Sequence, residues 1–292
     1  MSAADEHLAT RRAAGLFDFS FMGLYEFADR QAIQCAQTRD AAALKIGQAA
    51  YTLILNDDGS VFNDATVWRL GAERFWLFTG RPSDFARFRG DARDRSGEHA
   101  ILALQGPASG RILARLIGDQ AVRALRYFHF SEVNGMRVVR LGYSGELGYE
   151  LVLPRAGEAE LRARLSDVPA CSFEAANSLR IEAGYVLFDR EIDGRANPRE
   201  LGLEWLVAAR REFPVRRRLV GLEISGEGAP VAAAQLTSEC DSPTLGKRIG
   251  LGFAAPDARP GDPVRLGDGR AARVAPLPFY DPERRRPRDN RL

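Results

Sequence analysis

The stretch LILNDDGSVFND, residues 53–64, predicts a β-hairpin. An apolar run ends just before the turn sequence DDG, residues 57–59, and a second apolar run follows the turn. Aspartate followed by glycine between two apolar runs is a strong hairpin signal, because glycine supplies the positive φ that a tight turn needs. An amide and an acid, Asn63 and Asp64, stand inside the returning strand rather than in the turn. This strand is therefore a candidate for function as well as for the fold.

The sequence on either side of the hairpin mixes helical and strand patterns. Alternating aromatic residues predict a strand over 16–28, and an alanine-rich stretch predicts a helix over 26–44. An early proline followed by serine favours a further helix over 82–94. After a polar stretch at 206–218, short β runs are split by turns, which is typical of a small antiparallel barrel or sandwich. That polar stretch predicts a domain boundary.

Composition and charge argue against several classes of function. The net charge of +2, from 41 basic and 39 acidic residues among 292, is too balanced to indicate nucleic-acid binding. No apolar stretch reaches the roughly 18 residues of a membrane span. Residues 1–15 read as a short amphipathic helix and lack the apolar core of a signal peptide. We therefore expect a cytoplasmic protein with no membrane partner, and we interpret residues 281–292, DPERRRPRDNRL, as a basic tail in solvent.

The sequence holds no pattern typical of a metal site. The cysteines are widely spaced and form no CxxC pair; they are Cys35, Cys171 and Cys240. The histidines are equally scattered, at His7, His99 and His129. A zinc site is therefore not expected, and reduced structural thiols are the simplest interpretation of the cysteines.

Several stretches, in chain order, resemble the glycine-cleavage aminomethyltransferase (T-protein) family, a folate-dependent group. RAAGLFDFSFMG (12–23) is similar to the family's RxxxGxFDxSHMG, and LGYSGELGYEL (141–151) is similar to its TGYTGExGFEL. The hairpin ILNDDGSVFNDATV is similar to LNxxGGxxDDxxV. Further similar stretches are ALQGP, LRIEAGYVLF, NPRELGLEWLV and LTSECDSPTLGKRIGLGF, at residues 103–107, 179–188, 197–207 and 236–253. Each alone is a weak signal, but together they identify the chain as a divergent member of that family.

The resemblance implies an α+β fold, a three-domain clover-leaf around a central folate channel with a β-rich C-terminal domain. The first folate-binding domain would be split between residues 1–17 and 98–207. The second folate-binding domain, residues 18–97, would be inserted into the first, and residues 208–292 would form the C-terminal domain. The boundary expected from the polar stretch agrees with that division.

The resemblance also implies tetrahydrofolate as the cofactor and Asp64 as the catalytic residue over its reactive end. A carboxylate there can hold a substrate amine or accept a proton. A local hydrogen bond near the hairpin is the alternative for such an acid. Glu150 and Tyr143 match the family's pterin-binding glutamate and its tyrosine. A carboxylate can accept paired hydrogen bonds from the N3–H and 2-amino edge of a pterin.

Four more residues match cofactor-binding positions of the family: Tyr51, Met22, Tyr127 and Phe128. Tyr51 precedes Asp64 by the family's spacing and is expected to line the same channel. Met22 and the pair Tyr127-Phe128 match apolar and aromatic channel positions. Core packing is an equally good interpretation of those three.

The chain departs from the family at positions that the resemblance places on the channel or its entrance. Ala176 and Asn177 replace the arginine and aspartate of GARDxxRLEAG, and that arginine also holds the pterin. Losing a hydrogen bond to a charged group typically costs about 1.5–3 kcal/mol. The other departures are Phe21 for the histidine of SHMG, Asn63 for the first acid of the pair, Thr79 for an asparagine, and Glu239 for the glycine of TSG. They suggest a one-carbon donor other than the lipoyl-bound aminomethyl group.

We expect a tetrahydrofolate-dependent one-carbon transferase acting on a small N-, O- or S-methylated or aminomethyl substrate. A non-catalytic folate-binding accessory protein, a subunit of a larger one-carbon enzyme, and the same fold holding another ligand stay open as alternatives. The KGCYxGQE motif of the folate-binding paralogue that supports iron–sulfur assembly does not occur in the sequence. A partner protein or a homo-oligomer is compatible with the chain, and nucleic acid is not an expected partner.

Overall fold

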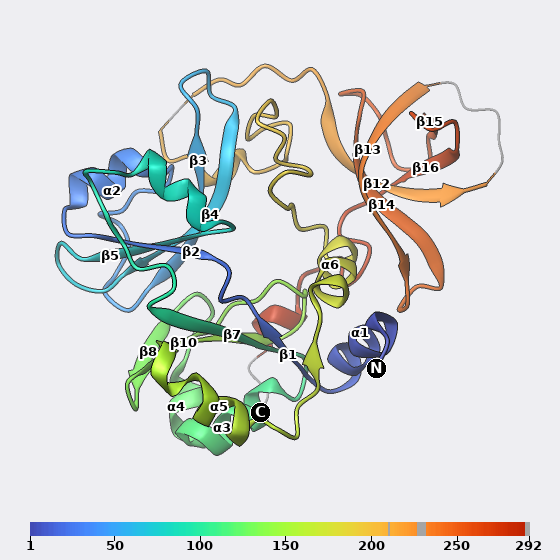
Figure 1. The fold of residues 1–292 in the computed structure, drawn as a ribbon. Coiled ribbons are helices and arrows are strands. Elements are labelled where there is room, and N and C mark those ends of the chain that lie inside the picture. The colour runs from blue at the N-terminus through green and yellow to red at the C-terminus, as the bar shows by residue number, and fades with distance from the viewer. Residues whose placement is uncertain (210, 227–231, 290–292) are drawn as a thin grey trace.

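The computed structural model describes residues 1–209, 211–226 and 232–289, whose strands fall into three groups (Figure 1). One sheet has six strands in the order β11-β1-β7-β10-β9-β8, and another has five in the order β3-β4-β5-β2-β6. The remaining strands close into a barrel, β12-β14-β13-β15-β16. Figure 1 places these groups as three lobes, with the barrel at the upper right and the five-stranded sheet at the left.

The six-stranded sheet takes its strands from two separate parts of the chain. The first part supplies β1 (Gly15–Asp18), which pairs antiparallel with β7 and parallel with β11. The second part supplies β7 (His99–Gln105), β8 (Phe130–Val133), β9 (Met136–Val139), β10 (Gly148–Pro154) and β11 (Ala170–Cys171). Amphipathic helices cover one face, with Leu113, Leu116 and Leu161 packed in the same apolar core as Leu102 and Leu151. They are α3 (Ser109–Ile117), α4 (Asp119–Ala124) and α5 (Glu158–Arg164), the last preceded by the 3₁₀ turn η2 (Arg155–Gly157).

The five-stranded sheet is built from the chain between those two parts. Its strands are β2 (Gly23–Phe27), β3 (Ala49–Leu55), β4 (Val61–Arg69), β5 (Phe75–Thr79) and β6 (Arg93–Asp94). The predicted hairpin is confirmed: β3 and β4 pair antiparallel, and the Asn56 amide donates to the Ser60 carbonyl at 2.9 Å. Gly59 in the turn has φ +87°, a conformation that glycine adopts without a steric penalty.

Three local predictions in this region are wrong. Residues 16–28 are two strands of different sheets, because the chain turns after β1 and its next apolar residues are buried in β2. The helix expected over 26–44 is only α2 (Arg30–Ala36), since the first residues of that stretch pair with β5. The helix expected over 82–94 is the short 3₁₀ turn η1 (Pro82–Arg87), followed by β6.

The C-terminal strands form the expected barrel, which lies against two helices from the earlier chain. Its strands are β12 (Arg218–Ser225), β13 (Ala232–Ser242), β14 (Lys247–Ala254), β15 (Pro263–Leu266) and β16 (Ala271–Ala275). The 3₁₀ turn η3 (Glu204–Leu206) precedes it. Helix α1 (Ala3–Arg12), capped by a reciprocal Ser2–Asp5 box, packs on α6 (Phe173–Glu182), and α6 contacts β13 and β14. This mixed architecture with a terminal β-barrel confirms the predicted fold class.

The segment after the barrel corrects the expectation of a tail in solvent. Arg286 pairs with the buried Glu146 at 3.3 Å, in the 3₁₀ turn η4 (Arg286–Arg288). The buried Arg140 donates to the Asp289 carbonyl at 2.6 Å. Residues 281–289 therefore run back over the first lobe, because charged groups buried there need partners. The tail's remaining residues, 290–292, lie outside the described part.

The division into residues 1–17 with 98–207, 18–97 and 208–292 is kept as a proposal for the domains. The sheets and the barrel are distributed along the chain in a way that supports it. The return of residues 281–289 to the first lobe means that the last part of the third segment packs away from the barrel.

Candidate functional site

Asn63 and Asp64 follow one another on β4, so their side chains lie on opposite faces of the sheet. Asn63 is fully buried, and its amide nitrogen donates to Oδ2 of Asp84 at 2.6 Å. Asp64 is partly exposed, and its Oδ2 accepts a hydrogen bond from the Tyr51 hydroxyl at 2.9 Å. The Asn63 side chain therefore ties β4 to η1, which carries Asp84. The Asp64 side chain lies on the other face of the sheet, with Tyr51 as its partner.

The carboxyl of Asp64 has an unusual acidity for an aspartate. Its pKa is raised from 3.8 to about 6, chiefly by burial and also by the charges of Asp84 and Glu191, while the hydrogen bond from Tyr51 opposes the shift. Protein surrounds most of the group, although part of its surface reaches solvent. A carboxyl that titrates near neutral pH can exchange a proton with a ligand at working pH.

Three tyrosines lie close to Asp64. The ring of Tyr143 is stacked on that of Tyr185, with centroids 6.0 Å apart and planes 26° apart. The Tyr143 hydroxyl donates to the Val186 carbonyl at 2.6 Å. Burial raises the pKa of Tyr51 and of Tyr143, and the charge of Asp64 raises both further. The tyrosines therefore remain protonated donors around the acid.

An apolar cluster joins the two sheets to α6, and we call it the inter-sheet cluster. Its buried members include Phe17, Trp68, Phe78, Ala103, Val152 and Ala176. Three predicted site residues, Met22, Phe128 and Tyr143, are partly buried and pack against it. The structure thus brings these three together, although they come from distant parts of the chain.

Glu150 faces the inter-sheet cluster. It lies on β10 and shares a face with Val152, because side chains alternate along a strand, and its register partners are Ala103 and Val139. Only 6% of its surface is exposed. Among the described residues it makes no hydrogen bond and no ion pair, and burial alone raises its pKa from 4.5 to about 7. Glu150 is thus a buried carboxyl whose hydrogen-bonding capacity the protein leaves unused.

Ala176 lies in the inter-sheet cluster that Glu150 faces and is 4% exposed. Its side chain adds apolar surface to that cluster and no charge.

Phe128 and Tyr127 lie where the chain bends before β8. Phe128 has φ +56°, a region that bulky residues rarely adopt, and its backbone is held by hydrogen bonds to Arg140 and Ala49, both at 2.8 Å. The rings of Tyr127 and Phe128 meet edge to face, with centroids 4.7 Å apart. Burial raises the pKa of Tyr127 to about 12. Residues held in strained conformations occur often at ligand sites.

The sequence reasoning missed Tyr185, although a signal for it exists. Tyr185 directly follows Gly184, whose φ of +67° ends α6 and turns the chain back toward Tyr143. A glycine that ends a helix reverses the chain, so the aromatic residue after it can pack against an element beside the helix. The motif LRIEAGYVLF contains both signals.

Arg180 and Glu182, two charged residues of α6, are both buried but belong to different networks. Arg180 pairs with Glu191 at 2.7 Å. Glu182 pairs with Arg11 at 2.7 Å and lies 3.1 Å from the His7 ring nitrogen Nε2. They tie α6 to its neighbours and are not paired with each other.

Within residues 1–209, 211–226 and 232–289, no three histidine, cysteine or acidic side chains are grouped as metal ligands would be. The cysteines are free thiols. No helix in this part of the chain is long and apolar enough to cross a membrane.

The three-lobed architecture with a C-terminal β-barrel is shared with known aminomethyltransferases, a class of transferases. Two family models match the chain: the GCVT N-terminal domain over residues 1–211 and the glycine cleavage T-protein C-terminal barrel domain over residues 217–281. The aminomethyltransferase of Rubrobacter xylanophilus is 34% identical over 97% of this chain and 87% of that protein. The aminomethyltransferase of Geobacillus kaustophilus is also 34% identical, over 96% of this chain and 90% of that protein.

A solved structure gives the same result. The crystal structure of glycine cleavage system aminomethyltransferase T from Bartonella henselae matches with a TM-score of 0.82 at 27% identity, over 96% of this chain and 90% of that chain. The chain belongs to the glycine cleavage T-protein family of aminomethyltransferases, which are enzymes of folate-dependent one-carbon metabolism. The family assignment made from the sequence motifs is therefore confirmed.

Proposed function

We propose that this chain transfers a one-carbon unit, at the methyl, methylene or aminomethyl level, from a small N-, O- or S-linked substrate to tetrahydrofolate. The observation that carries the proposal is the buried carboxyl of Glu150, which has no partner among the described residues. Its oxygens are not among the fully enclosed unpaired atoms of the described residues, so they face space that a ligand can enter. A ligand with paired N–H donors would supply the hydrogen bonds that the protein does not make there.

The residues around Glu150 fit a pterin ring. Its carboxylate can accept two parallel hydrogen bonds from the N3–H and 2-amino edge, and these donors would lower its pKa below the free value of about 7. Met22, Phe128 and Tyr143 offer apolar and aromatic surface on the same cluster. Tyr127 adds a second ring beside Phe128. We assign these residues to cofactor binding.

Asp64 and Tyr51 are proposed to act at the reacting end. When bound, tetrahydrofolate supplies the nitrogen that receives the one-carbon unit. Asp64 would hold the substrate amine or take up the proton released there, and its pKa of about 6 suits both tasks. Tyr51, which donates to Oδ2 of Asp64 at 2.9 Å, would keep the carboxyl oriented and leave Oδ1 for the ligand. Orientation in a dry site supplies most of the rate enhancement in this account.

The donor and the cellular setting are further parts of the proposal. Phe21 and Ala176 make the region more apolar than the family pattern, which favours a donor other than a lipoyl-bound aminomethyl group. Free thiols fit a reducing compartment, so we propose a cytoplasmic enzyme with a small-molecule substrate. A partner protein or a second copy of the chain is compatible with this function.

Turnover with tetrahydrofolate tests the proposal. Purified chain would be incubated with tetrahydrofolate and a panel of methylated and aminomethylated amines, ethers and thioethers, and the folate products separated by chromatography. Asp64→Asn keeps the shape of the side chain but cannot take up a proton at neutral pH, so turnover should fall about 10²–10⁴-fold. Asp57→Asn, the same change at an exposed acid in the turn of the same hairpin, is the matched control. Equal rates in the wild type and Asp64→Asn would refute the catalytic role.

The accessory-protein alternative has one observation in its favour. Ala176 removes a charged contact to the pterin that the family pattern contains, and one such contact is worth about 1.5–3 kcal/mol. Tetrahydrofolate binding without turnover of any donor in the panel would support this alternative over the transferase.

A further inference from the structure

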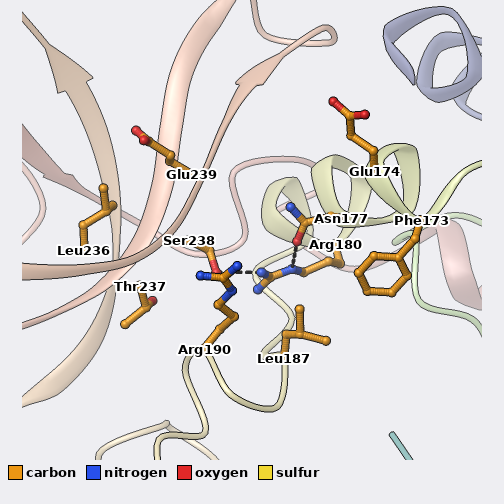
Figure 2. A pocket seen from close by; sticks show the side chains of 10 residues that line it. All are labelled: Phe173, Glu174, Asn177, Arg180, Leu187, Arg190, Leu236, Thr237, Ser238 and Glu239. Atoms are coloured by element: carbon orange, nitrogen blue, oxygen red, sulfur yellow. Dashed lines mark hydrogen bonds between the residues drawn. The ribbon is translucent and has the colours of Figure 1, made fainter. Parts of the chain in front are cut away.

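A cavity lies between α6 and β13, on the side of α6 away from the inter-sheet cluster. Its volume is about 480 Å³, and its walls carry Asn177, Arg180 and Arg190 together with apolar side chains (Figure 2). None of the residues assigned to tetrahydrofolate or to catalysis lines it. This volume is within the range of small-molecule sites.

Arg180 provides a buried hydrogen-bond donor on the cavity wall. Its side chain is 1% exposed. Nε donates to Oδ1 of Asn177 at 2.9 Å, and Nη1 donates to Glu191 at 2.7 Å and to the Tyr185 carbonyl at 3.0 Å. Nη2 donates to Ser238 at 2.6 Å. A guanidinium has five N–H donors, so within the described residues the second hydrogen of Nη2 is left for a ligand.

Two more donor groups line the same cavity. Asn177 uses its oxygen to hold Arg180, and its amide nitrogen has no acceptor among the described residues. Arg190 is exposed, and its guanidinium likewise has neither a carboxylate nor a carbonyl partner in that part of the chain. In Figure 2 its guanidinium points toward Ser238, the residue that Arg180 also contacts. Planar donor groups gathered in this way match a carboxylate.

The remaining walls are apolar or acidic. Phe173 is 45% exposed and Phe21 is 43% exposed. Their rings meet edge to face, with centroids 5.8 Å apart. Leu187 and Leu236 complete the apolar surface. The two rings and the leucines offer an apolar surface on which the body of a ligand can pack.

Acidic groups limit the charge that the cavity can accept. Arg180 is neutralised by Glu191, so Arg190 is the cation without a partner on the described walls. Glu174 and Glu239 also line the cavity, and Glu239 is engaged by Arg270 at 2.7 Å. Their negative field disfavours ligands that carry two or more negative charges.

We propose that this cavity is a second ligand site, which binds a small monocarboxylate with an apolar or aromatic body. The carboxylate lies between Arg190, Nη2 of Arg180 and the amide of Asn177, and the body rests on Phe173 and the two leucines. Two of the positions at which the sequence departs from the family pattern, Asn177 and Glu239, line the cavity, and a third, Phe21, packs against its rim. The resemblance alone placed these positions on the folate channel or its entrance, whereas the structure gathers them at this cavity.

Calorimetric titration of the full chain tests the proposal without tetrahydrofolate. The probes are 3-phenylpropionate and its uncharged amide, 3-phenylpropanamide. We expect saturable binding of the acid and at least roughly tenfold weaker binding of the amide, because the charged contacts are lost. Arg190→Gln should weaken binding of the acid by a similar factor. Arg285→Gln is the matched control, since Arg285 is also exposed and pairs only with Glu283 among the described residues.

Three results would overturn the inference. The first is no saturable heat with the acid up to millimolar concentration, and the second is equal affinity for the acid and the amide. The third is loss of acid binding in the presence of saturating tetrahydrofolate, which would place the carboxylate in the folate site. Glu150→Gln separates this proposal from the proposed function, because it should change tetrahydrofolate binding and leave binding of the acid unchanged.

Discussion

Glu182 and Glu150 are both buried glutamates, yet the protein treats them in opposite ways. Glu182 accepts hydrogen bonds from Arg11, from the Ser242 hydroxyl and from the backbone amide of Thr244, and it lies 3.1 Å from Nε2 of His7. Its partners lower its pKa from 4.5 to about 2 against the effect of burial. Glu150 has no partner among the described residues, and burial raises its pKa from 4.5 to about 7. The first carboxylate is satisfied by the fold, and the second is the one that we propose binds the pterin.

Burial does not distinguish the two glutamates, because both are buried. Their hydrogen-bond partners do, since only Glu182 has them among the described residues. Glu182 connects α1, α6 and the turn after β13, three elements far apart in the sequence. Glu150 makes no such connection among the described residues, and it lies on the strand face that meets the inter-sheet cluster. The absence of a protein partner is the reason that we propose a ligand-binding role for Glu150 and a structural role for Glu182.

The largest expected effect is on stability at Glu182. Glu182→Ala leaves Arg11 and His7 buried without their shared acceptor, and breaking a buried ion pair in this way costs about 3–5 kcal/mol. Urea unfolding followed by circular dichroism measures the loss. Glu150→Gln should change the free energy of unfolding by less than about 1 kcal/mol or increase it, since no partner is stranded. A larger loss in Glu150→Gln than in Glu182→Ala would break the comparison.

The pH dependence of stability should show the two acids acting in opposite directions. The pKa of Glu182 is lowered from 4.5 to about 2, so its contribution is complete above pH 4.5 and is lost as the pH falls toward 2. The pKa of Glu150 is raised from 4.5 to about 7, so its contribution is complete below pH 4.5 and is lost as the pH rises toward 7. Each shift corresponds to about 3 kcal/mol.

Unfolding free energies between acidic and neutral pH check this prediction. The difference between wild type and Glu150→Gln should change in the range from pH 4.5 to 7, and that between wild type and Glu182→Gln in the range from 4.5 to 2. Parallel curves for wild type and Glu150→Gln across the upper range would show that Glu150 titrates normally.

The smallest expected effect concerns Asp64, an acid with one protein partner. Tyr51→Phe removes the hydrogen bond that opposes the raised pKa of Asp64, so that pKa should rise above about 6. A neutral donor to a carboxylate is worth about 1 kcal/mol, or somewhat less than one pH unit. The acidic limb of the pH–rate profile should move to higher pH by that amount. Tyr127→Phe is the control, because its ring contacts Phe128 and no hydrogen bond links it to Asp64.

The sequence predicted what depends on local patterns. The Asp-Gly turn specified the β3–β4 hairpin, and the short apolar runs after residue 218 specified the barrel. Motif spacing was sufficient to nominate Glu150 and Asp64. The extents of α2 and η1 were mispredicted, because their ends are decided by pairing with strands of the five-stranded sheet.

Contacts between distant segments could not be predicted. The tail was interpreted as solvated, although Arg286 and Asp289 satisfy charged groups buried in the first lobe, and the tail's sequence carries no sign of those partners. The cavity beside α6 joins residues from the helix, the following loop and β13. The strand β13 lies far from the other two segments in the sequence, and no periodic pattern predicts that they meet.

The central claim, that the unpaired carboxyl of Glu150 is the pterin contact, is tested most directly by calorimetric titration with tetrahydrofolate under anaerobic conditions. Wild type should bind, and Glu150→Gln should bind about ten- to a hundredfold more weakly, because a charged paired contact is lost. Glu146→Gln, in the same motif but engaged by Arg11 and Arg286, is the control that should bind as the wild type does if it remains folded. Equal affinity in wild type and Glu150→Gln, or no binding by the wild type at near-millimolar tetrahydrofolate, would contradict the account.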